Sequence, residues 1–510
     1  MTDFPWLTTL AAIPLVGSVV VAAMPKGREL LAKQVALAVS ILALVVTVVM
    51  ALQFNPDDKA MFQFSQVHEW IPQFGVSYAV GVDGIALVLI ALAAVLTPVC
   101  ILASWHDVDG ATRSVNGYFA LLLLLETMMI GVFAATDVFL FYILFEAMLI
   151  PMYFIIGAYG GTQRSYAAVK FLLYSLFGGL LMLAAVIGLF VVSDGGDHAF
   201  LFQNLVGMHI APNTEKLLFL GFFTAFAIKA PLWPVHTWLP DAAAEAPPGG
   251  AVLLVGVLDK VGTFGMLRFC LPLFPNASKW ATPVVITLCV IGIIYGALLA
   301  IGQTDLKRLI AYTSISHFGF IAMGIFAMTT QGQSGSTLYM VNHGFSTAAL
   351  FLIAGFLISR RGSRLIADYG GVQRVAPVLA GTFLVAGLSS LALPGLSSFV
   401  SEFLVLVGTF TRYEAAAIIA TAGIILASVY VLWMYQRTMT GEPNEATAKL
   451  PDLTLRETWV VAPVLAIIIG LGVYPKVLLD VINPAVERTM IQIGQHDPAP
   501  VVPLEGAAAK

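Results

Sequence analysis

The chain has little charge for its length. Of its 510 residues only 11% are Asp, Glu, Lys or Arg, whereas 59% are hydrophobic. Soluble domains carry about 25% charged residues, and no segment between the apolar runs of this chain is long enough to form one. The composition therefore excludes a soluble enzyme and predicts a protein that lies in a lipid bilayer.

Cysteine is also scarce. Cys100, Cys270 and Cys289 stand singly in or beside apolar runs, without the close spacing that an iron-sulfur cluster, a zinc site or a redox pair requires. No two histidines are four residues apart, and none lies beside a cysteine. We therefore expect no metal and no cofactor in this chain, and we expect any electron transfer to take place in another chain.

An excess of charge of one sign is missing as well. The formal net charge is -4, so we expect neither a basic surface for nucleic acid nor an acidic tail. The chain begins MTDFPW, with an acid where a signal peptide has basic residues. The first apolar run is therefore expected to stay in the membrane as a helix.

Long apolar runs are what the sequence has in abundance. Each is roughly 20 residues long, the length that crosses a bilayer, and short loops rich in Gly, Pro and charge separate them. They predict an all-α polytopic membrane protein with about fourteen transmembrane helices and both termini on one side. The helices are expected near residues 5–24, 33–53, 81–104, 115–134, 136–157, 166–192, 216–239, 247–271, 280–302, 305–328, 335–358, 376–409, 414–436 and 457–475.

These helices suggest a division of the chain into five parts. Three helices come first, two groups of five helices follow, and a last helix precedes a flexible tail rich in Pro and Ala. The five parts are residues 1–114, 115–271, 272–440, 441–492 and 493–510.

Lys and Arg are unevenly distributed between alternate loops. The richer set, with fifteen residues against eight, is cytoplasmic by the positive-inside rule, which predicts that both termini are periplasmic. Lys229 and Lys260 belong to neither set and are expected inside the membrane. The richer set is Lys26, Arg28, Lys33, Arg113, Arg164, Lys170, Lys307, Arg308, Arg360, Arg361, Arg364, Arg374, Arg437, Lys449 and Arg456, and the poorer set is Lys59, Lys216, Arg268, Lys279, Arg412, Lys476, Arg488 and Lys510.

Two of the expected helices are interrupted near their middles. The seventh reads AIKAPLWPVHTW and contains Lys229, and the twelfth reads ALPGLSSFVSEF and contains Glu402. A broken helix inside a membrane needs a wet or protein-lined cavity, and paired broken helices in inverted repeats mark transport sites. Because the two are five helices apart, an odd offset, the two five-helix groups are predicted to form an inverted repeat.

Four charged residues are expected deep in the membrane. Glu146 comes about ten residues into its helix, which at about 1.5 Å per residue places it near the bilayer midplane. Lys229, Lys260 and Glu402 lie at a similar depth. Each such charge costs at least about 2.5 kcal/mol, so the bundle needs a polar interior. Static salt bridges are the alternative, but buried ion pairs stabilise poorly compared with apolar packing, and we therefore favour proton transfer.

A buried lysine changes its charge readily. Desolvation favours the neutral amine, whereas an approaching carboxylate favours the ammonium. A change in the distance between Glu146 and Lys229 would then switch the lysine between the two forms. Lys260 would accept or relay the proton, and Glu402 would release it at the far end. Such groups titrate together rather than singly.

Histidines could bridge the gaps between these charges, because imidazole exchanges protons near neutral pH. His317 and His343 are the best placed, and His236 follows Lys229 by one to two helical turns. A buried histidine can equally be a packing residue with satisfied hydrogen bonds, and the sequence leaves that alternative open for each of them.

Three acids are secondary candidates. Glu126 lies within an otherwise apolar helix and could be a conducting or a structural carboxylate. Asp137 stands at the start of the fifth helix, where it could be the N-cap. Asp241, followed by Glu245, lies after the seventh helix and could gather protons at the cytoplasmic mouth.

Five segments resemble one family. They read FEAMLIPMY, AIKAPLWPVHTWLPDAAAEAP, VLDKVGTFGMLRF, TDLKRLIAYTSISHFGF and VNHGFSTAALF, and they resemble the antiporter-like subunits of respiratory complex I and of Mrp cation/proton antiporters over about residues 115–440. The resemblance implies that Glu146 and Lys229 are the Glu-Lys pair of the family, Lys260 its central lysine, and His317 and His343 its central histidines.

The residue on the broken twelfth helix distinguishes branches of this family. The M-type subunit of bacterial NADH-quinone oxidoreductase has Glu there, whereas the L-type and N-type subunits and the Mrp proteins usually have Lys. Glu402 therefore resembles the M-type. An L-type chain would also continue into a long lateral helix, and this chain stops within about 35 residues of the last expected span.

The resemblance also implies a setting. The chain would lie in the bacterial inner membrane between N-like and L-like subunits, bind no cofactor, and translocate protons with energy from NADH oxidation and quinone reduction. FMN, iron-sulfur clusters and quinone would be held by partner subunits. Two alternatives remain open at this stage: a sodium/proton exchanging Mrp-type subunit, and a membrane scaffold that conducts nothing.

Overall fold

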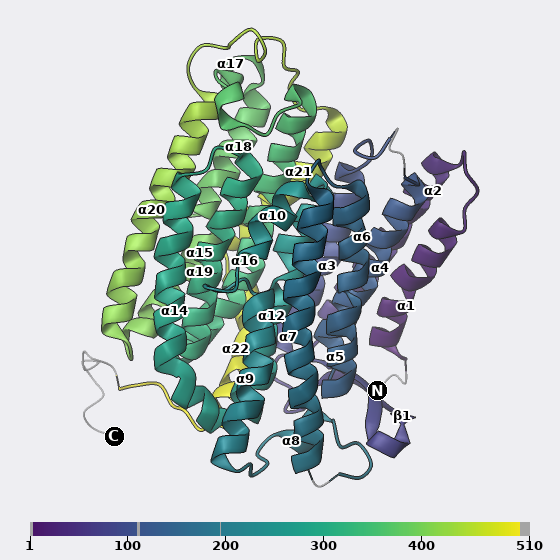
Figure 1. The fold of residues 1–510 in the computed structure, drawn as a ribbon, viewed down its shortest axis with the longest axis vertical. Helices are drawn as coiled ribbons and strands as arrows, with labels where there is room; N and C mark the ends of the chain where they lie inside the picture. The colour runs from purple at the N-terminus through teal and green to yellow at the C-terminus, as the bar shows by residue number, and fades with distance from the viewer. Residues whose placement is uncertain (1–3, 110–112, 194, 500–510) are drawn as a thin grey trace.

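The chain forms a bundle of long helices (Figure 1). The computed structural model describes residues 4–109, 113–193 and 195–499. Within these residues, eleven helices are long and apolar enough to cross a membrane, and three shorter apolar helices accompany them. The predicted all-α membrane fold is therefore confirmed, while the count of fourteen transmembrane helices stays a prediction.

The helices follow one another with short connections. Their bounds are α1 Trp6–Ala22, α2 Glu29–Gln53, α3 Gly84–Ala103, α4 Val115–Ala134, α5 Val138–Ala147, α6 Leu149–Tyr159, α7 Arg164–Val192, α8 Phe202–Leu205, α9 Pro212–Lys229, α10 Trp238–Glu245, α11 Pro248–Leu253, α12 Lys260–Gly265, α13 Leu271–Leu273, α14 Pro275–Ile301, α15 Leu306–Phe326, α16 Thr330–Arg361, α17 Val372–Val375, α18 Pro377–Ser390, α19 Ser397–Phe410, α20 Glu414–Met439, α21 Leu455–Val473 and α22 Lys476–Gln492.

Both described ends of the chain lie at the lower end of the bundle in Figure 1, and α17 lies at the upper end. This arrangement agrees with the prediction that the termini share one side. Which side of a membrane that is stays a prediction. Of the expected flexible tail, residues 500–510 lie outside the described residues.

The two expected helix interruptions are present. The seventh helix ends as α9 at Lys229, and the chain resumes as α10 only at Trp238. Pro231 and Pro234 lie in this gap, and proline cannot donate the backbone hydrogen bond that continues a helix. The twelfth helix is likewise divided, into α18 and α19, by six residues that include Gly395 at φ 92°. Glycine reaches that backbone conformation without strain.

The eighth helix is irregular in a way that the sequence did not suggest. Two π-helical segments, η2 Leu254–Leu258 and η3 Met266–Cys270, lie on either side of the six-residue α12. This whole helix, from residue 248 to 273, is buried inside the bundle. π-helical turns are rare and concentrate at functional sites. We therefore expect a functional site at α12.

Two elements were not expected. An antiparallel hairpin, β1 Gln63–Ile71 and β2 Val76–Val82, follows α2 at the lower end of the bundle. Its outer strand is largely exposed, while β2 is buried. The other unexpected element is α22, which packs against α16 and α3. The sequence predicts helices from apolar runs of transmembrane length, and neither of these two elements contains such a run.

The expected position of Arg268 was wrong. It was assigned to a loop outside the membrane, but it lies in η3 with its side chain only 9% exposed. Its Nη2 forms an ion pair with Asp83 Oδ1 at 2.6 Å, and its guanidinium lies 4.9 Å from the centre of the Phe62 ring. The carboxylate of Asp83 compensates this buried positive charge.

Candidate functional site

The first part of the site lies where α5, α7 and α9 meet. Glu146 is near the end of α5, and its carboxylate rests against the backbone of α7 at Gly179, where a Cβ would fall 1.8 Å from Oε1. Lys229 is the last residue of α9 and is 1% exposed. Its Nζ lies 4.8 Å from the centre of the Phe145 ring and 5.8 Å from that of Phe171.

Glu146 and Lys229 interact without a direct bond. The two charges attract each other electrostatically, yet among the described residues neither Glu146 Oε1 nor Lys229 Nζ has a hydrogen-bond partner. A buried polar group without a partner is unfavourable. The pair is therefore not a directly hydrogen-bonded salt bridge.

Lys260 forms the second part of the site and is completely buried. Its Nζ donates to the backbone oxygen of Val255 in η2, at 2.5 Å, and to Nδ1 of His343 on α16, at 2.7 Å. The close crossing of η2 and α16 makes the second contact possible. A Cβ at Gly344 would lie 2.9 Å from the backbone oxygen of Gly256, so a larger residue there would push the helices apart.

From His343 the polar contacts continue toward Glu402. The rings of His343 and His317 are 5.2 Å apart, and His317 Nε2 is hydrogen-bonded to Tyr430 Oη at 3.2 Å. The His317 ring also lies 5.8 Å from that of Tyr339, whose Oη donates to Glu402 Oε2 at 2.8 Å. His343 and Tyr339 are four residues apart on α16, so they share one face of that helix.

Together these side chains connect both broken helices. We call Glu146, Lys229, Lys260, His343, His317, Tyr430, Tyr339 and Glu402 the buried row. At its far end Glu402 also lines a cavity of about 220 Å³ between the α18–α19 break and α20. The row thus ends beside a mostly apolar pocket that is open at the surface of the bundle.

The structure separates the expected site residues into two groups. Glu146, Lys229, Lys260, His317, His343 and Glu402 join the buried row. His236 is buried and packs edge-to-face on Tyr295, with ring centres 5.1 Å apart. No hydrogen bond joins it to Lys229 among the described residues. Glu126 is completely buried on α4, and no hydrogen bond or ion pair joins it to any described residue.

Asp137 and Asp241 have structural contacts. Asp137 is the N-cap of α5, as expected: Oδ1 accepts from the backbone N–H of Phe139 and of Leu140. Asp241 forms ion pairs with Lys170 at 2.7 Å and with Arg308 at 2.5 Å. Whether either residue also handles protons stays a prediction.

Two residues of the buried row, Tyr339 and Tyr430, and the buried Asp259 near it were not among the expected residues. Tyr339 could have been found, since it is four residues before His343 on one predicted helix. Tyr430 stands in an apolar run with no charged neighbour, and only the fold brings it to His317. Asp259 directly precedes Lys260 and interrupts the apolar run VGVLDKVGTF, so its charge is as conspicuous in the sequence as that of Lys260.

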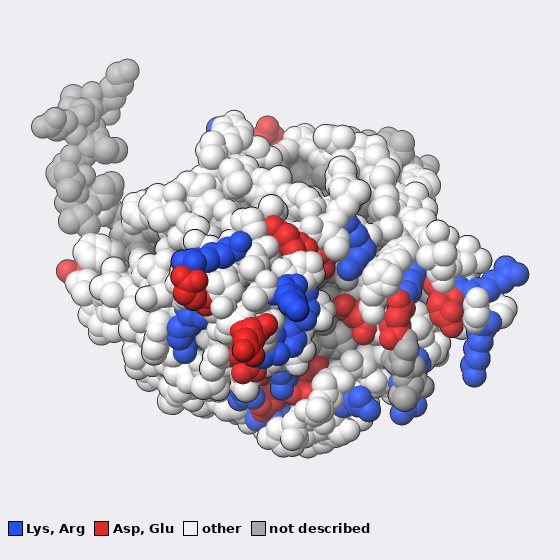
Figure 2. Space-filling view, turned by 90° about the horizontal axis from the view of Figure 1, so that it is seen from above, with Lys and Arg blue, Asp and Glu red and all other residues white. Residues whose placement is uncertain are grey.

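A different set of charges gathers at the upper end of the bundle, where acidic and basic side chains are interspersed (Figure 2). Most of them are paired. Arg364 contacts Glu245 at 2.9 Å and Asp305 at 3.1 Å, and Arg360 contacts Glu457 at 2.5 Å. We call Arg360, Glu457, Arg364, Glu245, Asp305, Asp241, Lys170 and Arg308 the upper polar cluster.

In the part of the chain that the structure describes, no three His, Cys, Asp or Glu side chains gather closely enough to bind a metal ion. The three cysteines are buried and unpaired with one another. The chemistry that the buried row can support is the movement of protons between amine, imidazole, phenol and carboxylate groups.

Comparisons with known proteins agree with this arrangement. The profile of a family described as NADH:quinone oxidoreductase/Mrp antiporter, transmembrane, matches residues 135–427. NADH-quinone oxidoreductase subunit M of Mycobacterium tuberculosis is 56% identical, over 98% of this chain and 97% of that protein. A chain in the structure of respiratory complex I from Thermus thermophilus with bound NADH is 31% identical with a TM-score of 0.87, over 96% of this chain and all of that one. A chain of the Mrp complex from Dietzia has a TM-score of 0.85 at 21% identity, over 97% of this chain and all of that one. The last likeness concerns the fold alone.

Proposed function

The chain belongs to the NADH:quinone oxidoreductase/Mrp antiporter transmembrane family, and we propose that it is the M-type subunit that translocates protons in the membrane arm of NADH:quinone oxidoreductase. The observation that carries the proposal is the continuous series of contacts from Lys260 through His343, His317 and Tyr339 to Glu402. Such a series joins groups that can exchange protons from one end to the other, which a scaffold does not require.

The proposed sequence of proton transfers starts at Lys229. While the carboxylate of Glu146 is near, it stabilises the ammonium form of Lys229. When Glu146 moves away, the ammonium loses its proton toward α12 and becomes a neutral amine. Lys260 takes up a proton as its amine becomes an ammonium, and its hydrogen bond to His343 Nδ1 is the path by which that proton leaves.

The second half of the path runs from His343 to Glu402. The 5.2 Å between the centres of the His343 and His317 rings is a gap that a ring rotation or one bridging water molecule spans. A proton that reaches the oxygen of Tyr339 lets the phenol pass its own proton to the carboxylate of Glu402, which becomes a neutral acid. Glu402 then releases the proton at the far end of the row.

We also propose the setting of this activity. The chain lies in the inner membrane of a bacterium with both termini on the periplasmic side, between N-like and L-like antiporter subunits. NADH oxidation and quinone reduction take place on FMN, iron-sulfur clusters and quinone held by partner subunits. The cysteine spacing and the uneven distribution of Lys and Arg support this assignment.

A sodium/proton exchanging Mrp-type subunit is the second candidate, because the bundle also has the fold of a chain from an Mrp complex. The residue at the end of the row argues against it, since Glu402 occupies the position where Mrp proteins usually have Lys. Purification of the native assembly tests the choice. Flavin and iron-sulfur absorbance are expected in it, and an assembly without them would favour the Mrp-type reading.

Replacement of Lys229 tests proton translocation itself. In membrane vesicles that contain the assembled complex, Lys229→Met is expected to lower NADH-driven proton pumping by about tenfold or more, because removal of a positioned proton-transfer group has effects of that size. Lys216→Met, on the same helix but with its Nζ over the exposed Trp280 ring, is the matched control. Unchanged pumping in an assembled Lys229→Met complex would contradict the proposal, and loss of assembly alone would favour a scaffold.

A further inference from the structure

Asp259 is a charged residue that the mechanism above does not use. It stands between η2 and α12 and is completely buried. Among the described residues, neither of its carboxylate oxygens has a hydrogen-bond partner. An ionised carboxylate in such a place is strongly unfavourable unless positive charges compensate it. The positively charged residues nearest to Asp259, and the side on which each of them lies, therefore determine which proton transfers Asp259 can take part in.

The face of α12 that carries Asp259 packs against the end of α9. Residues three apart lie on the same face of a helix, and three residues after Asp259 comes Gly262. A Cβ at Gly262 would lie 2.5 Å from the backbone oxygen of Phe226 and 2.7 Å from the backbone nitrogen of Ala230. This contact places the Asp259 face of α12 directly beside Lys229.

The neighbouring face of α12 points to a different helix. Lys260 Nζ reaches His343 on α16, and Thr263, three residues later, donates to Met340 Sδ on α16 at 2.9 Å. Successive residues of a helix point about 100° apart. Asp259 therefore looks toward Lys229, while Lys260 looks toward the histidines of the buried row.

Asp259 interacts electrostatically with both lysines, more strongly with Lys260 than with Lys229. Lys229 in turn interacts with two carboxylates, Glu146 from one side and Asp259 from the other. Glu146 lies on α5 and Asp259 directly before α12, so Lys229 stands between two acids from different parts of the chain.

We propose that Asp259 is the proton carrier between Lys229 and Lys260. This inference rests on the proposed function, which does not say how the proton passes from Lys229 to Lys260, and it supplies that step. The ammonium of Lys229 gives its proton to the carboxylate of Asp259, which leaves a neutral amine and a carboxylic acid. The acid then gives the proton to the amine of Lys260, which restores the carboxylate and forms the ammonium that contacts His343.

The test compares isosteric variants in membrane vesicles that contain the assembled complex. Asp259→Asn is expected to lower NADH-driven proton pumping about tenfold while NADH oxidation by the complex persists. Asp259→Glu keeps an exchangeable carboxyl and is expected to retain most of the pumping. Infrared difference spectra recorded during turnover supply a second readout, since a carboxyl band present in the unmodified complex is expected to vanish in Asp259→Asn.

Glu126→Gln is the matched control. Glu126 is equally buried and also has two unpaired carboxylate oxygens, but no described lysine acts on it. We expect it to pump normally and to keep the Asp259 band. A loss of pumping that is equal in Glu126→Gln and Asp259→Asn would mean that any buried acid matters for packing, and would overturn the inference.

The remaining outcomes are also decisive. If Lys229→Met abolishes pumping while Asp259→Asn pumps normally, the inference about Asp259 fails and the proposed function stands. If neither variant affects pumping, the proposed function fails as well. If Asp259→Asn and the smaller Asp259→Ser both fail to assemble while Asp259→Glu assembles, Asp259 is a structural counter-charge and not a carrier.

Discussion

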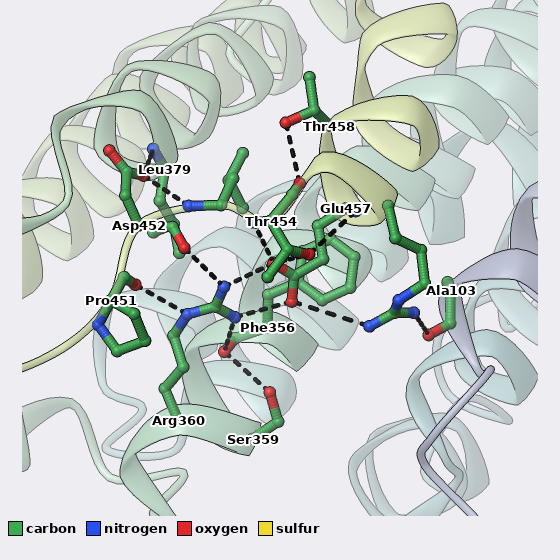
Figure 3. Close-up of polar contacts among 12 residues, drawn as sticks. Ala103, Phe356, Ser359, Arg360, Leu379, Pro451, Asp452, Thr454, Glu457 and Thr458 are labelled. Atoms are coloured by element: carbon green, nitrogen blue, oxygen red, sulfur yellow. Dashed lines mark hydrogen bonds and ion pairs between the residues drawn. The ribbon is translucent and has the colours of Figure 1, made fainter.

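The buried row and the upper polar cluster are both made of charged side chains from several helices, but they differ in how completely their charges are paired. In the cluster, Arg360 donates to both carboxylate oxygens of Glu457 and to the backbone oxygens of Pro451, Asp452 and Phe356 (Figure 3). In the row, Lys229 Nζ has no hydrogen-bond partner among the described residues. Fully paired charges fix helices in place, whereas unpaired ones keep the freedom to change protonation.

The surroundings of Glu457 show what complete pairing achieves. Glu457 belongs to a capping box with Thr454 at the start of α21, and the neighbouring Arg456 donates to the backbone oxygens of Leu102 and Ala103 at the end of α3. One group of contacts thus ties α3, α16 and α21 together, and α16 is the helix that carries His343 and Tyr339. We infer that these contacts around Glu457 hold the row in register.

Lys260→Met is expected to have the largest effect. It removes the ammonium that contacts Val255 and His343 while keeping much of the apolar volume of the side chain. Proton pumping in assembled vesicles should fall by about tenfold or more, with the amount of assembled complex little changed. Continued pumping would contradict the proposal that the buried row, unlike the upper polar cluster, transfers protons.

Arg360→Met should show the opposite result. Glu457 would keep only its contacts with Thr454 and with Arg456 at 3.9 Å. The loss is expected to cost about 3 kcal/mol of stability, which is measurable as a lower temperature of disassembly and less complex in the membrane. Pumping per assembled complex should stay normal. The double variant Arg360→Met/Glu457→Met removes both charges and should recover much of the stability, whereas a further loss would show that the pair does more than compensate charge.

Gly179→Ala is expected to have an intermediate effect. The new Cβ would fall 1.8 Å from Glu146 Oε1 and 2.4 Å from its Cδ, so the carboxylate has to move, which alters its distance from Lys229. We expect pumping to fall several-fold, while Ala in a helix adds about 0.5–1 kcal/mol of stability relative to Gly. Gly381→Ala on α18, where a Cβ would meet no atom within 4 Å, is the control. Equal pumping in the two variants would contradict the importance of the Glu146 position.

Arg374→Ala should have the smallest effect. Arg374 forms an ion pair with Glu442 at 2.7 Å, but the two side chains are 56% and 78% exposed. Exposed pairs contribute at most about 1 kcal/mol, so thermal stability and pumping are expected to change little. A loss as large as that of Arg360→Met would show that pairing itself, and not burial, gives the upper polar cluster its strength.

Much of the architecture could be predicted from residue patterns alone. The apolar runs predicted the helices, and the prolines at 231, 234 and 394 predicted the two interruptions. Glu146, Lys229, Lys260 and Glu402 were found because any charge in an apolar run is conspicuous. By the same reasoning Asp259 could have been found. Arg268 was assigned to a loop because it stands near the end of its run, and its partner Asp83 is far away in the sequence.

The remaining features depended on contacts between distant segments. The hairpin β1–β2 and the helix α22 lack long apolar runs, so a count of such runs could not reveal them. Tyr430 reaches His317 only because α20 packs near α15. The π-helical segments beside Lys260 have no signature in the order of residues, since the same apolar side chains also form ordinary α-helix.

The sequence by itself determined that the chain lies in a membrane, where its helices run, and which buried groups carry charge, because hydrophobicity and charge are properties of single residues. Only the tertiary structure decided which of those charges are paired and which are not. Pairing depends on distances of a few ångströms between helices, and those distances follow from side-chain packing across the whole bundle. The distinction between the upper polar cluster and the buried row, and with it the proposed place of Asp259 between the two lysines, exists only in the folded chain.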